Sequence, residues 1–155
     1  MSELVFSPAK FEDRYEDIKQ FFGLHWQETK TTAETSELKV DYNRYLALEQ
    51  AGMLYFVVAK SAVNNQIVGY FVGILAPTTI HPNELWCLTD HYFLAPNFRK
   101  WNNGQKFIKF VEADLKGRGL SGLKIMTRPN LNRGKVLERL GYSEMEIVYF
   151  KKFKS

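Results

Sequence analysis

The chain has 155 residues, of which 45% are hydrophobic, 15% aromatic and 25% charged, and its formal net charge at pH 7 is +4. This length fits one domain, residues 1–155, and the composition is typical of a globular protein rather than a disordered or fibrous one. The lone cysteine, Cys87, excludes an internal disulfide and a cysteine-based metal site, and no secretory signal or membrane-spanning apolar run is visible, so we expect a cytoplasmic protein without membrane contact.

The first part of the chain predicts two helices. Residues 11–22 carry apolar side chains at spacings of three and four, which indicates an amphipathic helix. Residues 29–36 are polar and predict a loop. Asp41 is a candidate N-cap for a second helix that runs through Gln50 and closes at Gly52.

Three strands are predicted next. Residues 53–60 and 66–75 are apolar and rich in β-branched side chains, and an Asn-Asn turn between them favours a hairpin. Residues 85–94 predict a third strand, which Pro96 stops.

The remaining elements alternate helix and strand. We expect a helix over 104–116 that Gly117-Arg-Gly119 ends, a strand over 123–127, a helix over 130–140 and a closing strand over 144–153. Strands that first meander and then alternate with helices predict an α/β or α+β fold, with a mixed, mostly antiparallel central sheet and helices on both faces.

The turn between the third strand and the following helix is a candidate anion site. It reads Arg99-Lys-Trp-Asn-Asn-Gly104 and opens directly into the helix. A helix N-terminus presents unpaired N–H groups and a partial positive charge, and Arg99 and Lys100 add to that charge. An ordinary turn with a solvated basic pair remains the alternative, and the absence of Gly-Lys-Ser/Thr excludes a Walker-type loop.

Two motifs together resemble the GNAT superfamily of acetyl-CoA-dependent N-acetyltransferases, in its small bacterial or phage form. The first is the run Leu94-x-Pro96-x-Phe98-Arg99-x-x-Asn102-x-Gly104, which is similar to that family's pyrophosphate loop, Arg/Gln-x-x-Gly-x-Gly/Ala. The second is Asn130 followed by Val136-Leu-Glu-Arg-Leu-Gly-Tyr142, which resembles the family's Asn and Glu-x-Leu-Gly-Phe/Tyr signature. The resemblance covers about residues 53–153, and the two N-terminal helices suit the family's first helix pair.

The resemblance implies direct attack of an amine on acetyl-CoA in a ternary complex, without a metal. The Leu94 amide would be the oxyanion donor, and Asp90 would be the general base, since it shares a face with Leu94 on a regular strand. His91 has the more suitable intrinsic pKa but points to the other face unless a β-bulge changes the alternation; structural roles remain open for both side chains. The residues implied in binding acetyl-CoA are Phe93, Leu94, Arg99, Lys100, Trp101, Asn102, Asn103, Gly104, Gln105 and Asn130.

Two positions depart from the family pattern. Asn102 replaces the first loop glycine, although Asn is the non-glycine residue that best tolerates a left-handed backbone. Leu137 stands where many members carry a tyrosine that protonates the departing thiolate, and leucine cannot donate a proton. The second hypothesis is therefore a catalytically weak or inactive GNAT-fold module that binds acyl-CoA and regulates.

The acceptor amine is a small molecule or a protein that the sequence does not identify. In this superfamily it is selected by loops that correspond here to residues 23–41 and 76–84, and His25, with Trp26 and Thr29, would line the acceptor pocket if it is more than an ordinary loop histidine. Dimers are common in the fold, so a homodimer is open. Nucleic acid is not expected as a partner, because the positive charge and the aromatic residues come without a recognised binding motif.

Overall fold

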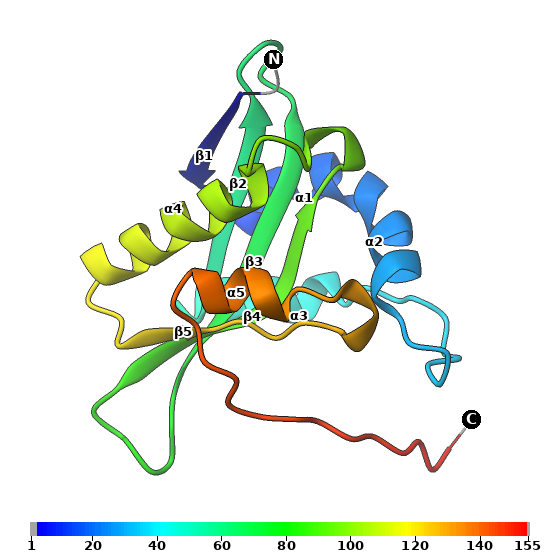
Figure 1. The fold of residues 1–155 in the computed structure, drawn as a ribbon, viewed down its shortest axis with the longest axis vertical. Helices are drawn as coiled ribbons and strands as arrows, with labels where there is room; N and C mark the ends of the chain where they lie inside the picture. The colour runs from blue at the N-terminus through cyan, green and yellow to red at the C-terminus, as the bar shows by residue number, and fades with distance from the viewer. Residues whose placement is uncertain (1–2, 155) are drawn as a thin grey trace.

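A single five-stranded sheet forms the centre of the computed structural model, which describes residues 3–154 (Figure 1). The strand order is β1-β2-β3-β4-β5, the first four strands pair antiparallel, and β5 pairs parallel to β4. The strands are β1 (Leu4–Pro8), β2 (Leu54–Ser61), β3 (Ile67–Pro77), β4 (Leu85–Leu94) and β5 (Gly122–Lys124). This confirms the mixed, mostly antiparallel sheet of an α/β or α+β fold.

Helices cover both faces of the sheet, as Figure 1 shows for α4 on one side and α1 and α2 on the other. The helices are α1 (Phe11–Ile18), α2 (Phe22–Thr29), α3 (Tyr42–Gln50), α4 (Asn103–Gly117) and α5 (Gly134–Arg139), with 3-10 turns η1 (Lys19–Phe21), η2 (Pro96–Phe98) and η3 (Pro129–Leu131). On the α4 side, Phe107 and Val111 pack with Phe71 of β3. On the other side, Phe11 and Ile18 pack with Tyr70. No helix within residues 3–154 has the length and apolar character that crossing a membrane requires.

Local patterning explains the elements that were predicted well. The side chain of Asp41 accepts a hydrogen bond from the Arg44 amide at 3.0 Å, which is the expected N-cap of α3. The hairpin of β2 and β3 turns at Asn65, whose φ of 60° is left-handed. Strand β4 spans the predicted residues 85–94.

Two predicted helices and one predicted strand differ in length from the observed ones. The first helix does not end at residue 22, because Phe21 and Phe22 pack on Phe93 and Tyr70 and the chain continues through η1 into α2 as far as Thr29. The helix expected over 130–140 is shorter, since the left-handed backbone at Asn132 separates η3 from α5. Strand β5 has three residues instead of the five expected over 123–127.

Two strands were predicted wrongly. Strand β1 was not expected, and its five residues pair with β2 from Leu4↔Ser61 to Pro8↔Val57. The closing strand over 144–153 is absent: within the described part of the chain these residues form no strand. The apolar pattern of the segment favours a strand, but a strand also needs an edge to pair with. Here the neighbouring β5 is only three residues long.

Candidate active site

Strands β4 and β5 are paired at one end only. The parallel ladder joins residues 86–88 of β4 to residues 122–124 of β5, and the Thr89 hydroxyl donates to the Lys124 carbonyl at 2.9 Å just beyond it. From residue 90 to Leu94, no strand in the described range 3–154 pairs with this edge of β4. The sheet is therefore split beside the last residues of β4.

The backbone of Leu94 faces this split. The Ala95 amide donates to the Val68 carbonyl at 2.8 Å, and the groups that bond across an antiparallel ladder alternate along the strand. The N–H and C=O of Leu94, one residue earlier, consequently point away from β3. The Leu94 carbonyl is taken by Nε of Arg99 at 2.7 Å, in agreement with this orientation. The Leu94 N–H is thus a backbone donor on the open edge of the sheet.

The turn that follows brings the N-terminus of α4 to the end of β4. Trp101 and Asn102 have φ of 54° and 59°, so Asn102 adopts the left-handed conformation expected of it. Asn103 is buried and donates from Nδ2 to the Phe98 carbonyl at 3.0 Å. Gly104 accepts from the Tyr92 hydroxyl at 2.7 Å, and a Cβ at this glycine would lie only 3.2 Å from that oxygen. The fifteen-residue helix is therefore fixed with its positive end beside the split.

Arg99 is held by a residue that the sequence analysis missed. Its terminal nitrogens donate to the two carboxylate oxygens of Glu28 in α2 at 2.7 and 2.8 Å, and its guanidinium lies 5.5 Å from the centre of the Phe93 ring. The arginine lowers the pKa of the Glu28 carboxyl. Nothing local in the sequence indicates Glu28, because the pair spans 71 positions.

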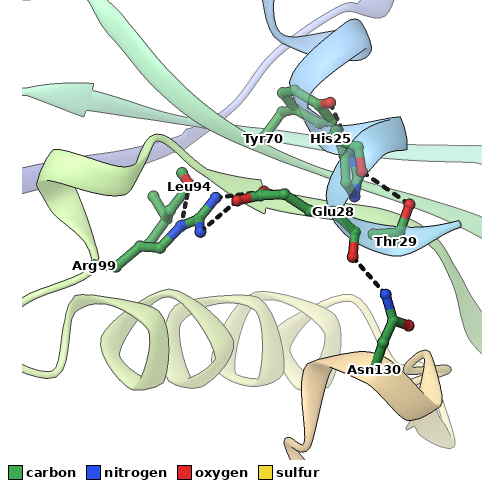
Figure 2. A network of polar contacts seen from close by, with 7 residues as sticks. All are labelled: His25, Glu28, Thr29, Tyr70, Leu94, Arg99 and Asn130. Carbon is green, nitrogen blue, oxygen red and sulfur yellow. Dashed lines mark hydrogen bonds and ion pairs between the residues drawn. The ribbon is translucent and has the colours of Figure 1, made fainter.

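The other residues predicted to bind acetyl-CoA lie in and around the turn. Asn130 donates from Nδ2 to the Glu28 carbonyl at 2.7 Å, so it ties η3 to the end of α2. Figure 2 shows that Arg99 contacts the carboxylate of Glu28 and Asn130 contacts its backbone carbonyl. Trp101 is 61% exposed, with the Lys100 ammonium 5.9 Å from its ring centre. Gln105 lies in the first turn of α4 and is partly buried.

A β-bulge at Asp90 changes which face the candidate bases occupy. The register of β3 with β4 moves from Val72↔His91 to Gly73↔Thr89, so Asp90 is the extra residue. The Asp90 carboxylate accepts from the Tyr45 hydroxyl of α3, and its Oδ2 lies 3.4 Å from His91 Nε2. Leu94 packs with the core on the α4 side. The expectation that Asp90 and Leu94 share a face is therefore wrong, since it assumed a regular strand, whereas the bulge brings Asp90 and His91 together on the side of α1, α2 and α3.

His91 opens into a pocket between these helices and the sheet. The cavity volume of this pocket is about 40 Å³, or about 430 Å³ when the open solvent at its mouth is included. Its walls are mostly apolar and aromatic and comprise Phe11, Phe22, His25, Trp26, Thr29, Leu38, Val40, Tyr45, Tyr70, Val72 and His91. His25, Trp26 and Thr29 thus line a pocket as expected, although His25 is a buried residue of α2 rather than a loop histidine.

Burial favours the neutral form of both histidines of the pocket, because it lowers the pKa of each. Burial lowers the pKa of His25 to about 4, and its Nδ1 lies 2.9 Å from the Tyr70 hydroxyl oxygen. Burial also lowers the pKa of His91, while the neighbouring Asp90 carboxylate acts in the opposite direction. A neutral imidazole beside a carboxylate can accept a proton from a bound amine.

Comparison with known proteins shows which solved structures have a similar fold. No protein-family model and no curated protein sequence matches the chain. The structure is similar to glucosamine-6-phosphate N-acetyltransferase from Arabidopsis thaliana, with a TM-score of 0.69, 17% identity and coverage of 98% of this chain and 99% of that one. It is similar to an aminoglycoside acetyltransferase from an uncultured soil metagenomic sample, with a TM-score of 0.73, 13% identity and coverage of 97% of each chain. It is also similar to ribosomal-protein-alanine N-acetyltransferase from Brucella melitensis biovar Abortus 2308, with a TM-score of 0.73, 15% identity and coverage of 99% of each chain. At such identities the likeness concerns the fold.

Proposed function

This chain has the fold of the GNAT acetyltransferases, and we propose that it is an acetyl-CoA-dependent N-acetyltransferase. The observation that carries the proposal is the open edge of β4 at Leu94, which lies beside the N-terminus of α4. A backbone donor and a helix N-terminus at one split of the sheet suit a thioester that is joined to a pyrophosphate.

The residues of the turn fit this donor. The pyrophosphate would lie on the first turn of α4, at Asn103, Gly104 and Gln105, where the positive end of the helix dipole favours an anion. The left-handed Asn102 shapes the approach, and Lys100 supplies an exposed positive charge. The pantetheine arm would run along the backbone of Phe93 and Leu94. Arg99 supports the loop through the Leu94 carbonyl, and Asn130 holds the opposite wall against α2.

The proposed reaction is a direct transfer. The neutral amine nitrogen attacks the thioester carbonyl carbon, the Leu94 N–H donates to the developing oxyanion, and the C–S bond breaks as CoA leaves as a thiolate. His91 takes the proton that the amine loses, and the Asp90 carboxylate stabilises the resulting imidazolium. The Tyr45 hydroxyl positions Asp90 for this role.

The pocket at His91 suits an acceptor with one amine on a small aromatic or apolar body. Its walls consist largely of rings, with Leu38 and Val40 closing it from the loop after α2. Asp90 is the carboxylate beside His91, whereas the nearby Glu28 and Glu34 are engaged by Arg99 and Arg128. A polycation such as an aminoglycoside or a polyamine needs several carboxylates to offset its charge, whereas the lining residues of this pocket include no carboxylate and Asp90 lies beside it.

The test is the release of CoA thiol from acetyl-CoA in the presence of single amines. We expect phenylethylamine and tryptamine to be acetylated with a higher kcat/KM than spermidine, kanamycin or glucosamine 6-phosphate. Val40→Glu adds a carboxylate to the pocket wall and should shift this preference toward spermidine, while Val63→Glu, on the exposed turn between β2 and β3, serves as the control. Faster turnover of the polycations by the parent protein would contradict the assignment of the acceptor, though not the acetyl transfer.

Leu137 favours a second candidate, a module that binds acetyl-CoA without efficient transfer. Its side chain is partly buried on α5 and offers no proton to a departing thiolate. Binding of acetyl-CoA without thiol release on any amine of the panel would favour this module.

A further inference from the structure

Arg133 is a charged side chain at the split of the sheet that the proposed reaction has not used. It is the N-cap residue of α5, and its guanidinium carbon lies 5.4 Å from the centre of the Tyr92 ring of β4. Tyr92 and Leu94 both pack with the core on the α4 side. Figure 1 shows α5 crossing in front of β4. Arg133 therefore reaches the stretch of β4 whose edge is open, two residues from Leu94.

The positive charge of Arg133 has no anionic partner in the described part of the chain. The side chain is partly buried, yet within residues 3–154 its guanidinium forms no ion pair and no hydrogen bond. Burial lowers the pKa of Arg133, and Arg99 acts in the same direction, while Tyr92 and Glu28 act in the opposite one. The Glu28 carboxylate is itself held by Arg99. Because charges removed from water are normally paired, this guanidinium is placed to receive an anion from a ligand.

The acyl donor offers two anions, its pyrophosphate and the thiolate that forms as CoA leaves. The pyrophosphate has the first turn of α4 and the exposed Lys100. In the proposed reaction the oxyanion has the Leu94 amide and the amine proton has His91, so the charge on sulfur is left without a group to meet it. Leu137, whose amide donates to the Arg133 carbonyl at 3.1 Å one turn further along α5, offers no proton. The thiolate is therefore the anion that needs the guanidinium.

We propose that the Arg133 guanidinium contacts the sulfur of the acyl donor and stabilises the thiolate as it leaves. This role depends on the acetyl transfer proposed above. As the amine attacks, the C–S bond breaks and its electron pair passes to sulfur, and the guanidinium meets that charge without giving up a proton, since an arginine stays protonated. The proton of the amine goes to His91. A fixed positive charge in a partly buried site thus takes the place of a general acid, and it acts more strongly there than in water.

The pH dependence of CoA binding tests the contact without any acceptor. The probes are CoA and S-methyl-CoA, which has no ionisable thiol, titrated calorimetrically from about pH 6 to about pH 9, a range that includes the ordinary thiol pKa of about 8.5. A positive charge close to an acid lowers its pKa by about one to three units, so the affinity for CoA relative to S-methyl-CoA should rise by about tenfold or more with pH. Arg133→Gln should abolish this rise, Arg133→Lys should keep much of it, and Arg139→Gln, on the exposed side of α5, is the control. An equal rise in the parent protein and Arg133→Gln would overturn the proposal, whereas absence of CoA binding by the parent protein would overturn the acetyl transfer itself.

A donor without phosphates separates the sulfur from the pyrophosphate as the partner of Arg133. S-acetylpantetheine keeps the thioester and the arm of acetyl-CoA but has no pyrophosphate. Arg133→Gln should lower kcat/KM by about tenfold or more, and by a similar factor for both donors, because the lost interaction forms at the sulfur that they share. Arg133→Lys should recover part of the loss with both donors. A loss confined to acetyl-CoA, or equal weakening of CoA and S-methyl-CoA at every pH, would show that the guanidinium binds phosphate and would overturn the proposal.

Discussion

Glu28 of α2 and Arg99 of the turn after β4 form a two-pronged ion pair, with N···O distances of 2.7 and 2.8 Å. The same guanidinium donates from Nε to the Leu94 carbonyl at 2.7 Å. The pair therefore joins the helix that lines the acceptor pocket to the backbone that is proposed to hold the donor. One side chain links both halves of the site, as Figure 2 shows.

We expect Arg99→Lys to weaken acetyl-CoA binding by about tenfold, because a lysine cannot hold Glu28 and the Leu94 carbonyl at once. The loss of stability should be small, about 1 kcal/mol or less, since the arginine side chain is 38% exposed and the ion pair is screened by solvent. Calorimetric titration and thermal unfolding measure the two effects. An unchanged affinity would show that Arg99 does not position the loop, and Arg139→Lys on the exposed side of α5 is the control.

The left-handed backbone at Asn102 predicts opposite outcomes for two substitutions. Asn102→Gly should bind acetyl-CoA as tightly as the parent protein, because glycine adopts a φ of 59° without strain. Asn102→Val should lose about 1 to 2 kcal/mol of stability and bind roughly tenfold more weakly, because a β-branched side chain opposes that conformation. Similar affinities for the two variants would argue against a donor site at this turn.

The Asp90–His91 pair predicts the pH dependence of turnover. Burial lowers the pKa of His91, so kcat/KM should rise with pH along an acid limb whose midpoint lies below the ordinary histidine pKa, and should be level above it. Asp90→Asn removes the charge that raises this pKa, and the limb should move to lower pH. His91→Gln should abolish the limb and most of the activity, while His25→Gln should leave the limb in place. A limb that survives in His91→Gln would assign the base elsewhere.

His25 predicts a separate pH dependence, of stability. Its pKa falls from an ordinary 6.5 to about 4 in the folded chain, so the unfolded state binds more protons between these values. The contribution of the neutral imidazole to the free energy of unfolding is fully present above pH 6.5. It is lost as the pH falls toward 4, and the loss is at most about 3 kcal/mol. The free energy of unfolding, measured by urea titration from neutral to acidic pH, should fall less steeply for His25→Gln than for the parent protein. Parallel curves would contradict a buried, neutral His25.

Local patterns predicted the parts of the fold that local interactions determine. The hairpin, β4, α4 and the Asp41 cap follow from alternation, periodicity and turn residues within a few positions of one another. The two motifs brought the turn at residues 99–104 to attention, and its left-handed Asn102 was expected from the intrinsic preference of asparagine.

Long-range contacts decided what the sequence could not predict. The bulge at Asp90 depends on the register between β3 and β4, next to Gly73, where a Cβ would lie 2.4 Å from the Cys87 sulfur. The position of Glu28 depends on the extension of α2, which the packing of Phe21 and Phe22 drives. The contact of Asp90 with His91 follows from the β3–β4 register, and the contact of Glu28 with Arg99 follows from the extension of α2. Neither can be predicted from the residues next to it in the sequence.

The central claim, that the split beside Leu94 and the N-terminus of α4 hold acetyl-CoA, is tested most directly by isothermal titration of the purified chain with acetyl-CoA. We predict one binding site per chain, with a dissociation constant between about 1 μM and 1 mM, the range of Michaelis constants common among enzymes, and weaker binding in Asn102→Val. Absence of binding heat at about 1 mM acetyl-CoA, in a protein that circular dichroism shows to be folded, would contradict the claim.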